Sequence, residues 1–422
     1  MVLFFAFIAI VIEHDTFCDT ADCIHHTSLL ERSVNTAIDP CDDFSAYVCS
    51  EFLQARFAEH DKSTIESLRY ALYQEFGKTL RMGTTKIQAG RKAMVMYEMC
   101  RGRRPVHGSQ LPLLRAFLQE LPLAWPKHSN TTLTAFSVVL SLAYRWQVPF
   151  WFAVSVLDDS SSGRRRVVVR PGTYIPIPRN YHLRVASDYL LYYKSYYAAY
   201  TADSGVNETA VDEMRVLEHT VLSKLNSVSK SLSPTLSVFS FREVDRRVPN
   251  TSTAYWLTRI DEGLHLEPRL TPEDEVVLSD VLVQALNNLV VMYGDEDLNA
   301  LLAWQLVQLY SPLAESALMT ARFGSKQKAE VFRPAYCAHH VEESFKVLVL
   351  SLATVSRITV KDRRLVTTAF INLASTALSK VNASRWMDNE SKARVAQKLA
   401  LVQMQMWPPE SLLSDVVLEE TY

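Results

Sequence analysis

The chain has 422 residues, 48% of them hydrophobic, which is enough for two or three ordinary domains or for one large helical domain with an appendage. Its net charge is −2, and the short basic runs at 101–104 and 164–166 lack interleaved aromatic residues, so the composition argues against a nucleic-acid-binding protein. Only 11 residues are glycine while Leu, Ala and Val are abundant, which favours helices over turn-rich β architecture.

The N-terminus combines an apolar run, Val2–Ile12, with a cluster of cysteines. The run is too short to span a bilayer, which requires about 20 residues. It fits the apolar part of a signal peptide or the distal half of a membrane anchor whose upstream part is missing, and the sequence leaves both open. Four of the six cysteines follow closely: Cys18, Cys23, Cys41 and Cys49. We therefore expect a signal-like or anchor segment at 1–17, a cysteine-rich segment at 18–52, and an extracellular protein, secreted or membrane-anchored.

Most of the remaining chain has the periodicity of amphipathic helices. In the first of them, Ile65, Leu68, Leu72 and Phe76 follow the spacing of one apolar face. Gly294 is expected to cap the end of one helix just before the next begins. Helices are predicted over 51–81, 86–100, 111–121, 132–147, 211–225, 274–292 and 297–313, from Arg333 onward, and over 361–378.

One stretch has a β pattern instead. Residues 150–156 and 166–170 are rich in Val and aromatic residues and flank a polar turn, Asp158–Gly163, which predicts a hairpin. The prolines between Pro171 and Pro178 predict an extended loop after it. The predicted fold is mainly α: a multi-helix domain with one small β-hairpin insertion, held by disulfides.

Five asparagines lie in N-x-S/T sequences without an intervening proline. With the cysteines, they support an extracellular surface that carries N-glycans. These candidate glycosylation sites are Asn130, Asn207, Asn250, Asn382 and Asn389.

Several motifs together point to a known family. The spacing C-x4-C from Cys18, the run D-P-C-D-D-F at 39–44 and Tyr47-Val48-Cys49 resemble the start of the ectodomain of the neprilysin and endothelin-converting-enzyme family of zinc metallopeptidases. The helix at 298–310 resembles that family's L-x-x-Y-L-x-W pattern, and 385–398 resembles its W-M-D block, with Ser391 in place of Thr, a mild exchange for an N-cap. The resemblance extends from Cys18 to about Pro409.

The resemblance implies a pairing for most cysteines. Cys18 should bond to Cys23, and Cys100 to Cys337. The family counterparts of Cys41 and Cys49 bond to cysteines of the catalytic half, which do not occur here, so these two lack partners. If they instead paired with each other, a helix would hold them about 12 Å apart, beyond the reach of a disulfide.

The resemblance also implies that residues 53–422 form the helical domain that covers the active-site chamber in full-length relatives. It places Arg69 near the position of an arginine that binds the carboxylate of short peptides, a task that suits the two-pronged guanidinium. An ordinary surface arginine is the alternative.

The catalytic motifs of such peptidases are absent from this sequence. The family requires H-E-x-x-H, in which two His on one helix face hold Zn²⁺ while the Glu activates water, and a downstream E-x-x-x-D. The nearest approach is the run 339–343, in which Glu343 stands where the second His is required. His339 and Glu343 are able to share a metal with a third ligand from elsewhere, or they belong to a solvated polar helix face. We predict no catalytic residue and no metal site or cofactor in this chain; zinc belongs to the full-length relatives.

The sequence therefore predicts the non-catalytic N-terminal region of a neprilysin-like zinc metalloendopeptidase that, at full length, hydrolyses extracellular peptides. The chain alone is expected to be inactive. The alternatives are a secreted pseudo-peptidase that binds peptides or proteins and a degenerate copy. Expected partners are peptides for the full-length form, a catalytic half, or a second copy of the chain through an exposed apolar patch.

Overall fold

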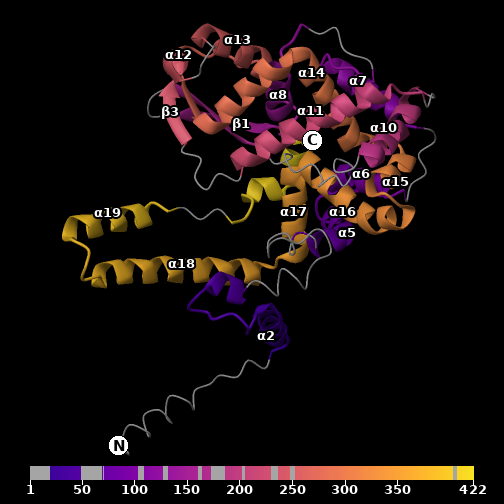
Figure 1. Cartoon of the computed structure of the whole chain (residues 1–422). Helices are drawn as coiled ribbons and strands as arrows, with labels where there is room; N and C mark the ends of the chain where they lie inside the picture. The colour runs from indigo at the N-terminus through magenta and orange to yellow at the C-terminus, as the bar shows by residue number, and fades with distance from the viewer. Residues whose placement is uncertain are drawn as a thin grey trace, which may run out of the picture. The chain divides into compact units, whose positions relative to one another are not determined.

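Figure 1 shows the fold of the chain as a computed structural model. Its residues group into two compact units, 1–76 and 77–422. The apolar run 2–12 lies outside the described residues. The same holds for the predicted ends of the signal-like or anchor segment, at residue 17, and of the cysteine-rich segment, at residue 52. The structure describes residues 20–48, 69, 71–102, 109–126, 132–159, 164–172, 186–201, 205–229, 236–247, 252–402 and 406–422.

In the first unit, aspartates organise the chain around the D-P-C-D-D-F motif. Asp39 Oδ1 accepts a hydrogen bond from the backbone N–H of Cys41 at 2.8 Å, which forms an Asx turn. Asp43 Oδ1 accepts one from the N–H of Ala46 at 2.8 Å and so caps a short helix at 44–48. The preceding helix, α2 (Ala21–Ser33), begins at Thr20. The motif is therefore a turn followed directly by a helix start.

The second unit contains a four-stranded sheet in the order β1-β2-β4-β3. The predicted hairpin is confirmed: β1 (Phe152–Asp159) pairs antiparallel with β2 (Arg164–Pro171). β2 then pairs in parallel with β4 (Glu275–Ser279), and β3 (Leu236–Ser240) adds to β4 in antiparallel fashion. The hairpin is thus half of a larger sheet, whose other two strands the sequence analysis missed.

The prediction of a helix from residue 274 was wrong at its start, because residues 275–279 form β4 and the helix begins at Asp280. Val276, Val277 and Leu278 are buried in the sheet. A short continuous apolar run of this kind fits a buried strand as well as a helix, so periodicity alone does not separate the two. Asp274 contributes by accepting the N–H of Arg165 at 2.8 Å, which ties the chain before β4 to the start of β2.

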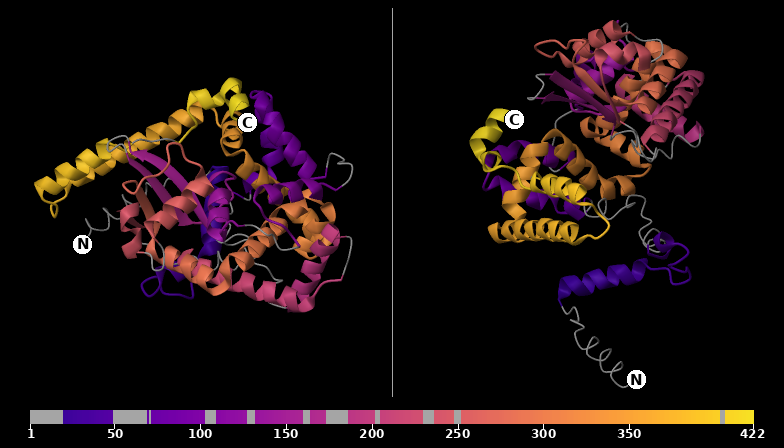
Figure 2. Two further views of the ribbon diagram at one scale, coloured as in Figure 1. Left: turned by 90° about the horizontal axis from the view of Figure 1, so that it is seen from above. Right: turned by 90° about the vertical axis from the view of Figure 1, so that its left-hand side faces the viewer.

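Helices surround this sheet, as Figures 1 and 2 show. Gly263 of α13 lies so close to α8 that a Cβ placed on it would come within 2.6 Å of Leu140 Cβ, so these two helices require glycine at their crossing. The helices of the second unit, with α5 beginning at its edge, are α5 (Phe76–Thr84), α6 (Arg91–Cys100), α7 (Leu111–Glu120), α8 (Ala135–Tyr144), α10 (Ala186–Thr201), α11 (Glu208–Ser229), α12 (Val244–Arg247), α13 (Thr253–Leu264), α14 (Asp280–Ala314), α15 (Ser316–Phe323), α16 (Lys326–Ser344), α17 (Lys346–Arg357), α18 (Val360–Ala383), α19 (Asn389–Ala400) and α20 (Asp415–Thr421), with short 3₁₀ turns η1 (Gln88–Gly90), η2 (Phe241–Glu243) and η3 (Glu410–Leu413).

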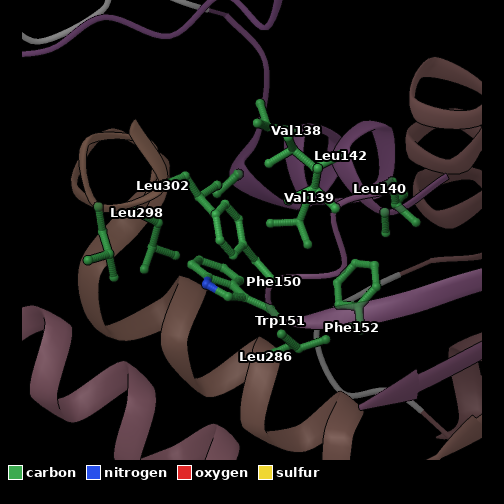
Figure 3. Close-up of a cluster of buried hydrophobic side chains, with 14 of the residues drawn as sticks. Val138, Val139, Leu140, Leu142, Phe150, Trp151, Phe152, Leu286, Leu298 and Leu302 are labelled. Carbon is green, nitrogen blue, oxygen red and sulfur yellow. The ribbon is translucent and has the colours of Figure 1, made fainter. Parts of the chain in front are cut away.

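The core of the unit lies where α8, the segment leading into β1, and α14 meet, as Figure 3 shows. Trp151, buried there, donates from Nε1 to Gln305 Oε1 of α14 at 3.1 Å, so its one polar atom is satisfied. The labelled side chains of this cluster are Val138, Val139, Leu140, Leu142, Phe150, Trp151, Phe152, Leu286, Leu298 and Leu302.

The structure also tests two predicted helix boundaries, at Gly294 and at Arg333. Gly294, with φ 75°, interrupts α14 where the sequence predicted a break between two helices. The prediction that a helix opens at Arg333 was wrong: α16 begins at Lys326, where Ser325 accepts a hydrogen bond from the N–H of Lys328, and Pro334 lies inside it. A helix tolerates one such proline at the loss of a backbone hydrogen bond when its other contacts hold it.

Among the described residues, no helix is both long and apolar enough to cross a membrane.

The disulfide implied for the second unit is present. Cys100 at the end of α6 and Cys337 within α16 are bonded, with their Cα atoms 5.7 Å apart and 237 positions apart in sequence. Both side chains are buried. The bond therefore joins the early helices of this unit to the later ones.

We expect the double variant C100S/C337S to lose about 4–5 kcal/mol of unfolding free energy, because opening so long a loop returns its conformational entropy to the unfolded chain. Urea denaturation followed by circular dichroism measures this loss. C41S is the matched control, since the Cys41 thiol is free and exposed, and it should stay within about 0.5 kcal/mol of wild type. Equal stabilities for the double variant and wild type would contradict the expectation.

Candidate functional site

A buried polar cluster in the second unit surrounds Glu218 of α11, which is 1% exposed. Its Oε2 accepts hydrogen bonds from Tyr189 Oη of α10 at 2.9 Å and from Trp304 Nε1 of α14 at 3.1 Å. Its Oε1 accepts one from Gln308 Nε2 of α14 at 2.8 Å. Burial raises the pKa of this carboxyl, and the three donors act in the opposite direction.

Aromatic rings enclose this carboxylate. α10 is rich in tyrosine, and its tyrosines at three- and four-residue spacing turn one face inward. Tyr192 and Tyr196 lie against Trp304, which stacks on Trp125 with ring centroids 5.2 Å apart. Trp304 is the tryptophan of the L-x-x-Y-L-x-W-like pattern, so that pattern marks a core position. Glu218 is thus bonded into the core rather than presented to a substrate.

We expect E218A to lower the free energy of unfolding by about 3–5 kcal/mol, because the buried donors of Tyr189 and Gln308 lose their acceptor and Trp304 Nε1 keeps only its bond to Tyr189 Oη. Urea denaturation checks this. The matched control is E213A, an exposed glutamate on the same helix, which should change stability by about 0.5 kcal/mol or less. Similar losses in the two variants would show that the network does not hold the helices.

The run 339–343 lies on α16, where the structure brings three possible metal ligands together. One ligand atom each from His339, Glu342 and Glu343 lies within 4.8 Å of the others, and all three side chains are half-buried. Glu342 is a candidate for the third ligand that a metal shared by His339 and Glu343 would need. Glu343 also pairs with Lys346 Nζ at 3.2 Å, so a cation would compete with that ammonium.

This trio differs chemically from a peptidase zinc centre. One imidazole and two carboxylates are able to chelate a divalent cation on a helix surface. H-E-x-x-H uses two imidazoles as ligands and keeps its glutamate free to activate the bound water. In the trio, both glutamates would be ligands. It therefore does not reproduce the catalytic arrangement.

The neighbouring His340 has a different environment. It is 3% exposed, its ring lies 4.5 Å from that of Tyr336 and 5.7 Å from that of Tyr310, and its Nε2 has no hydrogen-bond partner in the described structure. Burial, followed by the charges of His339 and Arg322, lowers its pKa well below the ordinary value. His340 is therefore a neutral core residue.

This environment makes stability depend on pH. Unfolded His340 takes up a proton below about pH 6.5 while the folded ring stays neutral, so the unfolded state binds more protons and the free energy of unfolding falls with falling pH. We expect wild type to lose about 1.4 kcal/mol more than H340F between pH 7.5 and 5.5. The raised pKa of Glu218 acts with the opposite sign and is common to both proteins.

Urea denaturation at the two pH values measures this difference. H219F, at an exposed histidine of α11, is the control and should retain the pH dependence of wild type. Parallel pH profiles for wild type and H340F would refute the assignment.

Arg69, the candidate substrate contact, belongs to the first unit and is exposed. Its Nε donates to Tyr73 Oη at 2.8 Å, and its guanidinium lies 5.6 Å from the centre of the Tyr73 ring. This stacking orients the guanidinium, but its role as a carboxylate contact stays a prediction.

The other candidate residues are distributed over the surface. Cys23 is disulfide-bonded, Cys41 carries a free and exposed thiol, and Cys18 and Cys49 lie outside the described residues. Asn207, Asn382 and Asn389 are exposed, as glycosylation requires, and Asn207 Oδ1 accepts a hydrogen bond from the N–H of Thr209 at the start of α11. Asn130 and Asn250 also lie outside the description. The structure therefore brings none of the described candidates together into a catalytic site.

The helices α18 and α19 form an antiparallel pair that projects from the end of α17, as Figures 1 and 2 show, and we call this pair the arm. Neither helix has a buried side chain. Leu365 and Leu373 are both 69% exposed, and Ile371 is 58% exposed. Because these side chains lie on different sides of α18, the helix displays apolar surface in several directions.

The W-M-D block lies at the tip of the arm. Trp386 is 84% exposed. Asp388, rather than Ser391, is the N-cap of α19: its carboxylate accepts hydrogen bonds from the N–H of Ser391 at 2.8 Å and from its hydroxyl at 2.7 Å. A hydroxyl residue at position 391 thus supports the cap from the third position of the helix, which corrects the role expected for it.

Comparisons with known proteins agree with these motifs. The family model described as "Peptidase family M13", for its N-terminal part, matches residues 40–409. Neprilysin-3 of Drosophila melanogaster is 20% identical, and the match covers 96% of this chain and 55% of that protein. Neprilysin of Homo sapiens is 20% identical over 95% of this chain and 58% of its own length. This chain therefore spans somewhat more than half the length of these relatives.

A solved structure shares the fold. The cryo-electron microscopy structure of the zinc metalloprotease Zmp1 of Mycobacterium tuberculosis in its open state matches with a TM-score of 0.50 at 14% identity. The match covers 90% of this chain and 61% of that one.

Proposed function

Because the chain belongs to peptidase family M13, we propose that it is the non-catalytic N-terminal region of a neprilysin-like zinc metalloendopeptidase that, as a whole, hydrolyses extracellular peptides. The observation that carries the proposal is the match of residues 40–409 to the N-terminal part of the family, in a sequence without H-E-x-x-H. The zinc and its water-activating glutamate would then belong to a second half, and the helical domain would limit access to them.

The cysteines support an extracellular setting. The buried Cys100–Cys337 bond and the bonded Cys23 are typical of proteins that fold in an oxidising compartment. In this proposal, the free thiol of Cys41 is one half of a bond to the catalytic half.

The arm is the surface that we assign to contact with the catalytic half. A leucine or isoleucine gains roughly 1.5–3 kcal/mol when its side chain leaves water. Leu365, Ile371 and Leu373 are each more than half exposed, so together they offer several kcal/mol to a partner that covers them. The chain alone should therefore self-associate through the arm, whereas association with a catalytic half should keep it soluble.

Zinc content and peptidase activity of the secreted chain test the proposal. We expect no zinc to remain after dialysis and no cleavage of a fluorogenic peptide. Sequencing of transcripts that encode the chain is expected to find a continuing reading frame with H-E-x-x-H, whose product cleaves the peptide and loses activity with a chelator.

Two outcomes would contradict this. Chelator-sensitive cleavage by the chain alone, lost in H339A, would place a catalytic metal at the α16 trio. Transcripts that end without the zinc motif, together with a stable secreted monomer that captures peptides, would favour a binding module.

A further inference from the structure

A pocket lies at the base of the arm, at the opposite end from the exposed Trp386. It has a volume of about 460 Å³, within the usual range for small-molecule sites. The N-terminal turns of α18 form one wall, and residues near η3 form the other. Its lining residues are Val360, Arg363, Arg364, Thr367, Thr368, Trp407 and Glu410.

The pocket contains more hydrogen-bond donors than its own residues use. Arg364 is exposed and forms no ion pair or hydrogen bond within the part of the chain that the structure describes. Arg363 Nε and Trp407 Nε1 are buried and lack hydrogen-bond partners there. Unpaired buried N–H groups are uncommon in folded proteins because each costs its desolvation energy. Arg364 thus offers its donors to the pocket, whereas the unpaired donors of Arg363 and Trp407 lie beneath its surface.

The acceptors at the pocket are few. Glu410 pairs with Arg363 Nη1 at 3.2 Å, but its side chain is 85% exposed, so this pair is weak and easily displaced. Asp362, on the same turn of α18, is engaged in the capping box with Thr359 at 2.6 and 2.9 Å. Two guanidinium groups against one pairing carboxylate leave the pocket with an excess of one positive charge.

We propose that this pocket binds an organic carboxylate, with the carboxylate on Arg364 and Arg363 and the apolar part against Val360 and Trp407. A guanidinium matches the two oxygens of a carboxylate with parallel hydrogen bonds. The single excess charge suits a monovalent carboxylate better than a divalent phosphate. The indole and the valine provide the apolar wall that an inorganic anion does not need. This proposal does not depend on whether the chain is part of a zinc metalloendopeptidase.

Isothermal titration calorimetry with N-acetyl-phenylalanine, its neutral amide and inorganic phosphate tests the site. We expect saturable binding of the carboxylate, at least about tenfold weaker binding in R364Q, and binding about threefold tighter in E410Q, where the competing carboxylate is gone. R385Q, at an exposed arginine of the same arm, is the matched control and should bind as wild type does.

The variants distinguish loss of the carboxylate site from loss of binding through misfolding. Because Arg364 is exposed, R364Q should keep the wild-type melting temperature, and E410Q shifts binding in the opposite direction, which misfolding does not imitate. Equal binding of acid and amide, stronger binding of phosphate, an unchanged R364Q, or the absence of saturable binding would each overturn the proposal.

Discussion

The buried carboxylate of Glu218 is the constraint on which much of the second unit depends. It stands on α11 and receives its hydrogen bonds from α10 and α14, so a single side chain fixes three helices relative to one another. A buried carboxylate is stable only when donors replace the water that it loses. That requirement restricts positions 189, 304 and 308 to donor side chains and explains why aromatic residues with polar atoms, rather than plain aliphatic ones, gather around them.

The unit combines this rigid body with an arm that has the opposite character. Around the sheet, most large apolar side chains are buried, and the indole N–H of Trp151 is hydrogen-bonded within the core, while that of Trp125 is buried without a partner among the described residues. On α18 and α19, apolar side chains face solvent, and the polar groups at the base of the arm retain unused donors. The body therefore buries most of its large apolar side chains, whereas α18 and α19 bury none of theirs. This division fits a chain that shares its family with proteins almost twice as long.

How well the sequence predicted the structure depended on the range of the interactions. The hairpin was predictable because its two strands are neighbours in sequence with a polar turn between them. β3 and β4 were not, because β4 pairs with a strand more than one hundred residues earlier and its valine run fits a helix equally well. The Cys100–Cys337 bond followed only from the family resemblance. Glu342 was not recognised as a neighbour of His339 and Glu343 before the structure placed all three on one face of α16. The pocket brings α18 close to residues near 410, and no local sequence pattern predicts that proximity.

The geometry of the arm also makes it a mechanical element. α18 has 24 residues and is therefore about 36 Å long. It follows α17 through the extended residue Ile358 and the cap Thr359, so it is attached to the body at one end. A rotation of about 10° at that junction would carry the far end of the helix through about 6 Å, while residues at its base would hardly move. A small rotation in the packing around Val360 would therefore displace the exposed tryptophan at the tip much further than the residues at the base.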